Sequence, residues 1–494
     1  MMYYLAIIVL TFYTIALLLI LFYSLAQLNL LIHYLKSEKN KKILPELDIS
    51  NPGKIPFVTI QLPVYNELYV IERLLENISQ IEYPKEKLEI QVLDDSSDES
   101  VAITAAKVAY LHKAGLDIKH IRRENRTGFK AGALKEGLRT AKGEFIAIFD
   151  ADFLPQKNWL LQTLPYFKNE KIGVVQTRWG HINRDYSLLT KMQAFAIDVH
   201  FTIEQVGRNS QGNFINFNGT AGIWRKETIL DAGNWDGGTL TEDLDLSYRA
   251  QLKGWVFKYL IDIETPAEVP AVISAARSQQ FRWNKGGAEN FRKFYREVIT
   301  TSGIPLKTRL HGIIHLLNST LFINVLIVAI LSVPVLYIKN YVPQLSDYFA
   351  ITGFFIISTV IFFICYWFAY KKVHGEGIKN QMAYTWLFFT FLAVAMGFSV
   401  HNSIAAIEGH LGVRSDFIRT PKFNLKNHKD SWKNNKYLAK KLSGNVIIEG
   451  LLILYFAFAI FSAIKLNDLG FIPFYFLIFS GFVYVFYQSI KAQI

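Results

Sequence analysis

Two carboxylates, Asp150 and Asp152, flank a single alanine in the stretch IFDADF, directly after an apolar run. Ionised groups at the end of a buried strand are costly to desolvate unless they are paired or bind a metal. A hard divalent cation takes one or two carboxylates together with phosphate oxygens, which is the arrangement expected for Mg²⁺ with a diphosphate. The pair therefore predicts a metal–diphosphate site, although a lone D-x-D triplet also arises by chance.

Two other acidic stretches have both a functional and a structural interpretation. VLDDSSDES places Asp94 and Asp95 after a strand, where a carboxylate accepts hydrogen bonds from a nucleoside or simply stabilises a turn. TLTEDLDLSYR places Glu242 and Asp243 at the start of a helical pattern. There a carboxylate either compensates the helix dipole or acts as a general base on an attacking hydroxyl.

Two small-residue stretches could contact phosphate or sugar. Lys130, in NRTGFKAGAL, precedes a helix start, where a lysine suits phosphate binding but is more often a solvated surface residue. FNGTAGIWR, which contains Asn218, Gly219 and Thr220, is either a sugar-contact surface ringed by aromatic residues or a plain tight turn.

These residues need a scaffold, and the pattern from about Ile55 to Tyr259 supplies one by alternating strands with helices. The runs FVTIQLPVYNE, EIQVLDD, EFIAIFDAD and IGVVQTRW are rich in β-forming residues and end in polar ones. Alternation of this kind predicts a mostly parallel α/β sheet covered on both faces. Ligands bind beyond the carboxyl ends of such strands, which is where the carboxylates fall.

The remainder of the 494-residue chain is membrane-like: 51% of all residues are hydrophobic, and the net charge is +12. An apolar run from Met2 to about Leu35 is long enough to span a bilayer, and the lysines that follow predict a cytoplasmic side for the next domain. Further apolar segments lie near 316–338, 349–370, 383–400, 446–464 and 471–487. The basic stretches 371–381 and 410–441 should both be cytoplasmic, so the segment 383–400 between them is expected to be re-entrant or interfacial.

QQFRWNKGG stands where the polar part ends and the apolar segments begin. Its Gln279, Arg282 and Trp283 could anchor the chain at a lipid interface or line a binding channel, and the residues up to Arg296 have the pattern of an amphipathic interface helix. The single cysteine, Cys365, excludes a disulfide framework and a thiolate metal site. No nucleic-acid recognition motif accompanies the basic charge, so a nucleic-acid partner is not expected.

Taken in order, VYNE, DD, GFKAG, DAD, FNGTAG, TEDLDLSYR and QQFRW resemble the processive family 2 glycosyltransferases. These include cellulose, chitin and hyaluronan synthases, and the closest resemblance is to the mannan and glucan backbone synthases of the cellulose synthase-like A and C groups. The resemblance covers roughly residues 58–293. It implies a GT-A-type α/β nucleotide-sugar transferase domain with an α-helical transmembrane region.

The resemblance also implies a role for each matching residue. Tyr65, Glu67, Asp94, Asp95, Lys130 and Asp150 would bind the nucleotide sugar; Asp150 and Asp152 would bind Mg²⁺ or Mn²⁺; Asp243, with Glu242 and Arg282, would carry catalysis; and Asn218, Gly219, Thr220, Gln279 and Trp283 would contact the acceptor. Phe417, Thr420 and Lys422, in DFIRTPKF, resemble the family's gating loop, with Arg419 where several relatives carry valine.

We therefore expect an inverting hexosyltransferase that extends a β-linked polysaccharide from GDP-mannose or UDP-glucose and secretes it. The expected domains are a transmembrane helix (1–35), a cytoplasmic transferase domain (36–275), interface helices (276–310) and a transmembrane region (311–494) with the gating-like loop near 410–441. The expected location is a bacterial inner or plasma membrane; whether an export partner is needed stays open. Two alternatives remain: a non-processive enzyme that glycosylates a lipid, as ceramide glucosyltransferases do, and a binding or transport subunit with an inactive transferase domain.

Overall fold

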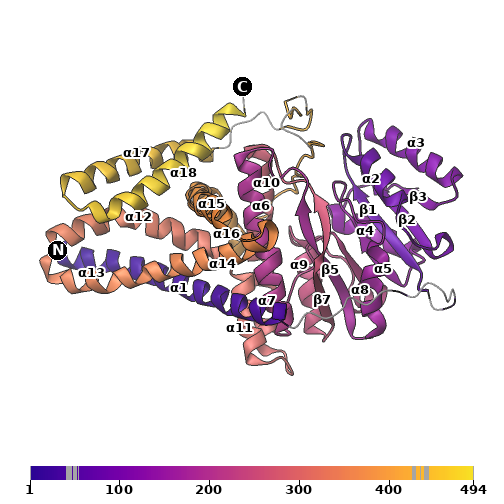
Figure 1. The fold of residues 1–494 in the computed structure, drawn as a ribbon, viewed down its shortest axis with the longest axis horizontal. Helices are drawn as coiled ribbons and strands as arrows, with labels where there is room; N and C mark the ends of the chain where they lie inside the picture. The colour runs from indigo at the N-terminus through magenta and orange to yellow at the C-terminus, as the bar shows by residue number, and fades with distance from the viewer. Residues whose placement is uncertain are drawn as a thin grey trace.

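The computed structural model describes residues 2–39, 47, 53, 55–425, 430–433, 435–438 and 444–492. Figure 1 shows an α/β domain beside a bundle of long helices, with the N-terminus at the far end of that bundle. The two parts meet at the helices α6 (Leu188–Val199) and α10 (Ile273–Thr300).

One seven-stranded sheet forms the centre of the α/β domain, in the order β3-β2-β1-β4-β6-β5-β7. The strands are β1 Val58–Val64, β2 Leu88–Asp94, β3 Asp117–Ile121, β4 Phe145–Ile148, β5 Ile172–His181, β6 Gly222–Arg225 and β7 Val256–Ala267. β6 runs antiparallel to both of its neighbours, and the other pairs are parallel. The predicted mostly parallel α/β sheet is thus confirmed, and its parallel strands end at one edge.

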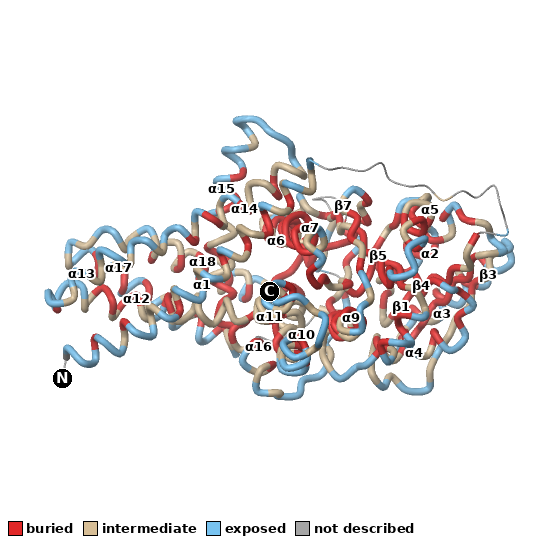
Figure 2. The backbone as a smooth tube through the Cα atoms, turned by 90° about the horizontal axis from the view of Figure 1, so that it is seen from below, coloured by how far each residue is buried: buried red, intermediate tan, exposed pale blue. Residues whose placement is uncertain are grey.

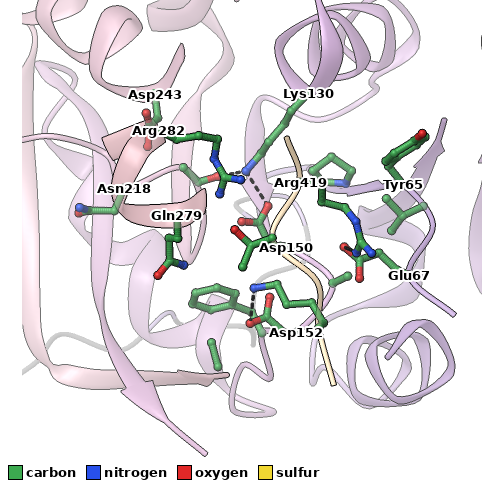
Figure 3. Close-up of a pocket in the computed structure, with 18 of the residues that line it drawn as sticks. Tyr65, Glu67, Lys130, Asp150, Asp152, Asn218, Asp243, Gln279, Arg282 and Arg419 are labelled. Atoms are coloured by element: carbon green, nitrogen blue, oxygen red, sulfur yellow. Dashed lines mark hydrogen bonds and ion pairs between the residues drawn. The ribbon is translucent and has the colours of Figure 1, made fainter. Parts of the chain in front are cut away.

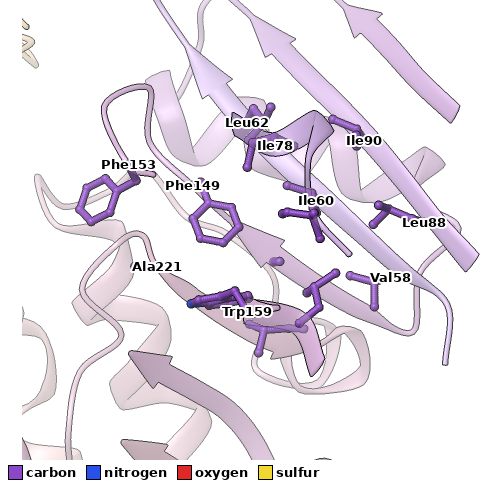
Figure 4. Close-up of a cluster of buried hydrophobic side chains, with 14 of the residues drawn as sticks. Val58, Ile60, Leu62, Ile78, Leu88, Ile90, Phe149, Phe153, Trp159 and Ala221 are labelled. Atoms are coloured by element: carbon purple, nitrogen blue, oxygen red, sulfur yellow. The ribbon is translucent and has the colours of Figure 1, made fainter. Parts of the chain in front are cut away.

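Helices cover both faces of this sheet, and its central strands are therefore buried on both sides. They are α2 Ile71–Ser79, α3 Ser100–Lys113, α4 Phe129–Thr140, α5 Trp159–Thr163, α7 Gln205–Ser210, α8 Lys226–Asp231 and α9 Glu242–Leu252. Alternate β1 residues such as Ile60 and Leu62 share one face and pack in a cluster that contains Ile78, Phe149 and Trp159 (Figure 4). Packing of these large side chains fixes the end of β4, where the DAD stretch begins.

The bundle consists of apolar helices, several of them long and a few short. They are α1 Met2–Lys39, α11 Leu306–Leu316, α12 Thr320–Tyr341, α13 Ser346–Thr352, α14 Ile356–His374, α15 Ile378–Gly397, α16 Ser399–Leu411, α17 Asn445–Lys465 and α18 Ile472–Lys491. Five stretches in the described residues are long and apolar enough to cross a membrane: 3–39, 320–341, 343–374, 445–465 and 469–491. Large apolar side chains such as Phe22 are exposed along them, as lipid contact requires, and Figure 2 shows many exposed positions over the bundle. The chain has the helices of a membrane protein.

The ambiguous segment 383–400 is not one straight helix. α15 ends at Gly397 and α16 begins at Ser399, with a 53° bend between them, the geometry of a broken span or a re-entrant loop. α15 also packs tightly on α18: a Cβ on Gly397 would lie 2.4 Å from the carbonyl oxygen of Gly481. The segment predicted to be re-entrant or interfacial thus coincides with a bent helix pair, and its path relative to the membrane stays a prediction.

Candidate active site

A cavity of about 180 Å³ opens at the carboxyl ends of β1, β2 and β4. Sixteen of the residues singled out from the sequence line it: Tyr65, Glu67, Asp95, Lys130, Asp150, Asp152, Asn218, Gly219, Glu242, Asp243, Gln279, Arg282, Trp283, Phe417, Thr420 and Lys422. Figure 3 shows most of the labelled charged groups converging from opposite walls. Residues more than 350 positions apart in the chain are brought into one site.

Two of the predicted residues do not line the cavity. Asp94 is buried at the end of β2, where it accepts hydrogen bonds from the Ser96 amide (2.8 Å) and contacts His120 Nε2 (2.7 Å). Thr220 is fully buried, and its hydroxyl accepts a hydrogen bond from the Asp150 amide at 2.9 Å. Neither side chain reaches the cavity in this structure: Thr220 supports Asp150, which lines it, and Asp94 supports the turn at Ser96. Their contacts with the sugar and the nucleoside stay predictions.

Lys130 projects from the start of α4 into a ring of oxygens. Its Nζ lies 2.5 Å from Asp150 Oδ1 and 2.9 Å from the carbonyl oxygen of Gly219. Burial lowers the pKa of Lys130, but the charges of Asp150 and Glu242 outweigh it, so the pKa is raised and the side chain is cationic. Gly219 has φ +80°, and a Cβ there would lie 3.0 Å from Asp243 Oδ2, so glycine allows the loop to approach that carboxylate.

Asp152 is fully buried, and its two oxygens differ in their partners. Oδ2 lies 2.8 Å from Lys422 Nζ and accepts the Glu268 amide at 3.1 Å. Oδ1 has no hydrogen-bond partner among the described residues. An unpartnered carboxylate oxygen beside a second aspartate suits a divalent cation. Within the described residues no group of three or more His, Cys, Asp or Glu could hold a metal, so Asp150 and Asp152 would need phosphate or water oxygens to complete the coordination.

Glu242 and Asp243 begin α9 and face the cavity from the wall opposite β1. Burial raises the pKa of Asp243 to about 7, with a further rise from the neighbouring Glu242 charge. Burial also raises the pKa of Glu242, against the lowering effect of Lys130. A carboxylate with a pKa near neutrality can exchange a proton at physiological pH, which an ordinary aspartate cannot. The third acid of the stretch, Asp245, instead pairs with Arg249 at 2.6 Å, outside the cavity.

Gln279, Arg282 and Trp283 lie on α10, and all three side chains line the cavity. The guanidinium of Arg282 lies over the ring of Phe417 at 5.0 Å, and it donates a hydrogen bond to the carbonyl oxygen of Ile418. Burial lowers the pKa of Arg282 to about 10, which leaves it cationic at neutral pH. The site therefore holds a permanent positive charge opposite the DAD carboxylates.

The segment 413–425 lies over the cavity and places two cations on its carboxylates. Arg419 pairs with Glu67 at 2.6 Å, and Lys422 pairs with Asp152. Phe417 stacks on Phe129 at 5.4 Å between ring centroids. Burial raises the pKa of Glu67 to about 7 even though Arg419 lowers it. This segment and the α/β domain are therefore on the same side of the helix bundle.

Comparison with known proteins now identifies the domain. Residues 56–286 match the family model described as "Glycosyltransferase like family 2". The chain contains a family 2 glycosyltransferase domain. The chain is 36% identical over 365 residues to a probable glucomannan 4-beta-mannosyltransferase of Oryza sativa subsp. japonica, covering 72% of this chain and 63% of the relative. It is 42% identical over 266 residues to a glucomannan 4-beta-mannosyltransferase of Cyamopsis tetragonoloba, covering 52% and 50%.

The match to these relatives is partial, since the chain spans about half to two-thirds of their length. Among solved structures, the mannosyltransferase PcManGT from Pyrobaculum calidifontis, in complex with GDP-Man and Mn²⁺, superposes with a TM-score of 0.50 at 19% identity. That alignment covers 81% of this chain and all of the other. It shows that the family 2 domain has the GT-A-like fold expected from the sequence.

A second cavity of about 410 Å³ adjoins the first, between the family 2 domain and the helix bundle. Seven residues line both cavities: Trp179, Ile197, Asn218, Thr241, Asp243, Gln279 and Trp283. The second cavity extends between α1, α6, α10 and α14–α16, so it leads from Asp243 toward the helix bundle. Its walls mix aromatic, amide and hydroxyl side chains.

Sequence reasoning missed two arginines of the family 2 site. The guanidinium of Arg126 stacks on the Tyr65 ring at 3.3 Å, on the wall that carries Asp95. Asp95 itself accepts a bidentate hydrogen bond from Arg123, at 2.9 and 2.5 Å. The sequence does contain a signal for them: three arginines lie between positions 122 and 126, just after β3, and form a basic run at the carboxyl end of a parallel strand.

Proposed function

We propose that this protein transfers hexosyl units, mannose in the first instance, from a nucleotide sugar to the end of a growing β-linked polysaccharide. The observation that carries the proposal is the adjacency of the two cavities at Asp243, a carboxylate that lines both. A donor in the first cavity and an acceptor in the second would meet at a half-buried carboxylate whose pKa is raised to about 7. That is the requirement for general-base catalysis of glycosyl transfer.

In the proposed reaction Asp243 removes the proton from the acceptor hydroxyl as that oxygen attacks the anomeric carbon. Lys130 and Arg282 are cationic and line the donor cavity, so they stabilise the negative charge that develops on the departing diphosphate. A Mg²⁺ or Mn²⁺ ion bound by Asp150 and Asp152 would neutralise part of the same charge. One displacement inverts the anomeric centre and gives a β-linkage from an α-linked donor.

The remaining side chains of the donor cavity are assigned to the nucleotide. Tyr65, Glu67 and Asp95 lie on the wall beyond β1 and β2 and would contact the nucleoside. Donor identity is inferred from the relatives, which are named mannosyltransferases, and from PcManGT, which binds GDP-Man. GDP-mannose is therefore our first choice of donor, ahead of UDP-glucose.

On the acceptor side, Asn218, Gly219, Gln279 and Trp283 would contact the terminal sugar, with Trp283 stacking on a ring. Phe417, Thr420 and Lys422 would form a gating loop, a proposal supported by their position among the residues that line the donor cavity. The glucomannan names of the relatives favour a polymer over the single-sugar glycolipid of a ceramide glucosyltransferase. All the charged residues expected of the site, on both walls of the donor cavity, are present, which argues against an inactive transferase domain.

We further propose that the transferase domain, residues 36–275, is cytoplasmic, with interface helices over 276–310 and a transmembrane region over 311–494. Lys36 and Lys39, at the end of α1, support this orientation under the positive-inside rule. Location in a bacterial inner or plasma membrane, and secretion of the product through the second cavity, are part of the same proposal.

The direct test is an Asp243→Asn variant in lipid nanodiscs with GDP-mannose and Mn²⁺. We expect turnover to fall by about 10²- to 10⁴-fold, the usual contribution of a general base, while calorimetry shows nearly unchanged donor binding. Glu227→Gln, a carboxylate-to-amide change on the exposed face of α8, is the matched control. Turnover within about tenfold of wild type would remove Asp243 as the base.

A further inference from the structure

Behind the acceptor wall, a chain of polar side chains reaches Asn218 from the helix bundle. His200 Nε2 lies 3.0 Å from Asn218 Nδ2, and His200 Nδ1 lies 3.0 Å from Glu204 Oε2. On the other side, Gln205 Nε2 donates to Asn218 Oδ1 at 2.7 Å. Asn218 thus has both ends of its amide held while it lines both cavities.

This chain of hydrogen bonds ends in two groups that can only accept, and they determine which atom donates in each hydrogen bond between them. Gln205 Nε2 also donates to the backbone carbonyl of Asn216 at 2.9 Å, and a carbonyl can only accept. The oxygen of the Asn218 amide therefore faces Gln205, and its nitrogen donates to His200. His200 must then be neutral, with its proton on Nδ1, where the Glu204 carboxylate accepts it. A backbone carbonyl at one end and a carboxylate at the other leave one orientation for the amide.

A π-helical turn makes this arrangement possible. Residues His200–Glu204 form the turn η4 between α6 and α7, closed by the hydrogen bond from the Gln205 amide to the His200 carbonyl. In a regular α-helix, residues five apart are rotated by roughly 140° and face different directions. The i to i+5 bond of a π turn winds the backbone more loosely and brings their directions closer together. His200 and Gln205 can therefore both reach Asn218.

Glu204 is itself held by groups from two helices. Gln27 of α1 donates to its Oε1 at 2.7 Å, and Arg208 of α7 donates to its Oε2 at 2.9 Å. Burial raises the pKa of Glu204, but Arg208 and His200 outweigh that effect and hold the pKa well below its usual range. An ionised Glu204 keeps the His200 proton on Nδ1. The first membrane helix is in this way connected to the acceptor wall.

We propose that His200 and Glu204 are positioning residues that orient the Asn218 amide toward the acceptor sugar beside Asp243. After its two internal hydrogen bonds, the amide keeps one free N–H and one free oxygen lone pair. A free donor next to a free acceptor matches two adjacent hydroxyls of a terminal hexose, each of which can donate and accept. The inference rests on the proposed function, because the ligand is its acceptor.

Two substitutions of one residue separate positioning from packing. In H200Q the amide oxygen can stand near the position of Nε2 and still accept from Asn218, while the contact with Glu204 is lost. In H200N the shorter side chain reaches Glu204 but not Asn218. We expect H200N to raise the KM for mannohexaose about tenfold, the loss of about one hydrogen bond, and H200Q to recover most of that loss. The KM for GDP-mannose should change less than about twofold in both.

The assay follows mannose transfer from GDP-mannose to mannohexaose in nanodiscs with Mn²⁺, alongside thermal unfolding of each variant. Gln205→Leu, which removes the donor on the other side of Asn218 without burying a charge, should raise the KM for mannohexaose as H200N does and covers the case in which H200N fails to fold. Equal KM values for H200N and H200Q, or equal changes in the KM for both substrates, would overturn the inference. Absence of transfer by the wild-type protein would instead overturn the proposed function, and the inference with it.

Discussion

Replacing Glu242 by glutamine should shift the pH dependence of transfer to lower pH. The pKa of Asp243 is raised to about 7 first by burial and then by the negative charge of Glu242. The substitution removes the charge of Glu242 and leaves the burial of Asp243 unchanged. A general base must be ionised, so activity is present above its pKa and is lost as the pH falls through it.

The size of the shift follows from the loss of one neighbouring charge, which is worth about one pKa unit at the lower end of the usual range. At pH 6 the wild-type Asp243 would be about one-tenth ionised, and the variant Asp243 about one-half. Relative to its own plateau, the variant should therefore retain about five times more activity at this pH. Its plateau can be lower, since Glu242 also contributes to the charge around Lys130.

The assay measures initial rates of nucleotide release at saturating donor, from about two units below to one unit above neutral pH. Glu227→Gln, remote from both cavities, is the control and should leave the apparent pKa unchanged. An apparent pKa that stays constant or rises in the Glu242→Gln variant would refute the assignment of Asp243 as the titrating base.

Three further predictions concern the metal and the packing of the helices. Asp152→Asn removes the carboxylate whose Oδ1 has no partner, so calorimetry with Mn²⁺ should show donor affinity at least about tenfold weaker, while affinities in chelator should match wild type. Gly207→Ala places a Cβ 2.6 Å from the Leu30 carbonyl oxygen and should lower the free energy of unfolding by about 1–3 kcal/mol. Arg277→Leu leaves the buried Glu449 without its partner at 2.7 Å and should cost about 3–5 kcal/mol, most of it recovered when both are leucine.

Each of these three has a contradicting result. A donor affinity of the Asp152→Asn variant in Mn²⁺ equal to that of wild type would remove Asp152 as a metal ligand. An unchanged thermal midpoint of Gly207→Ala would mean that α1 does not pack closely on α7. A double leucine variant as unstable as the single one would mean that the ion pair between α10 and α17 is not what the single substitution disrupts.

The scaffold was predictable because apolar runs and the polar residues that end them are local signals. Asp150, Asp152 and Lys130 follow strand ends or start helices, and parallel strands bring their carboxyl ends to one edge. Asp94 and Asp95 show the limit of that reasoning. Consecutive residues at the end of a strand point to opposite sides, so only the structure shows that Asp95 reaches the cavity while Asp94 is buried beside His120.

Contacts between distant segments could not be predicted from local pattern. Lys422 pairs with Asp152 across 270 positions, and the gating-like segment was expected from its motif but not its carboxylate partners. The π turn at His200–Glu204 likewise depends on packing against α1, because the sequence around it reads as an ordinary helix. Loop charge predicted a re-entrant or interfacial segment at 383–400, but neither the bend between α15 and α16 nor the contact of Gly397 with Gly481 of α18 has a local sequence signal.

The central claim is tested most directly by supplying GDP-mannose, with Mn²⁺, to the purified full chain in lipid nanodiscs and measuring the size of the product. UDP-glucose, UDP-N-acetylglucosamine and GDP-glucose are offered separately under the same conditions. The account predicts a β-linked polymer of mannose that β-mannanase degrades. A single-sugar lipid product, or a polymer from another donor alone, would contradict it.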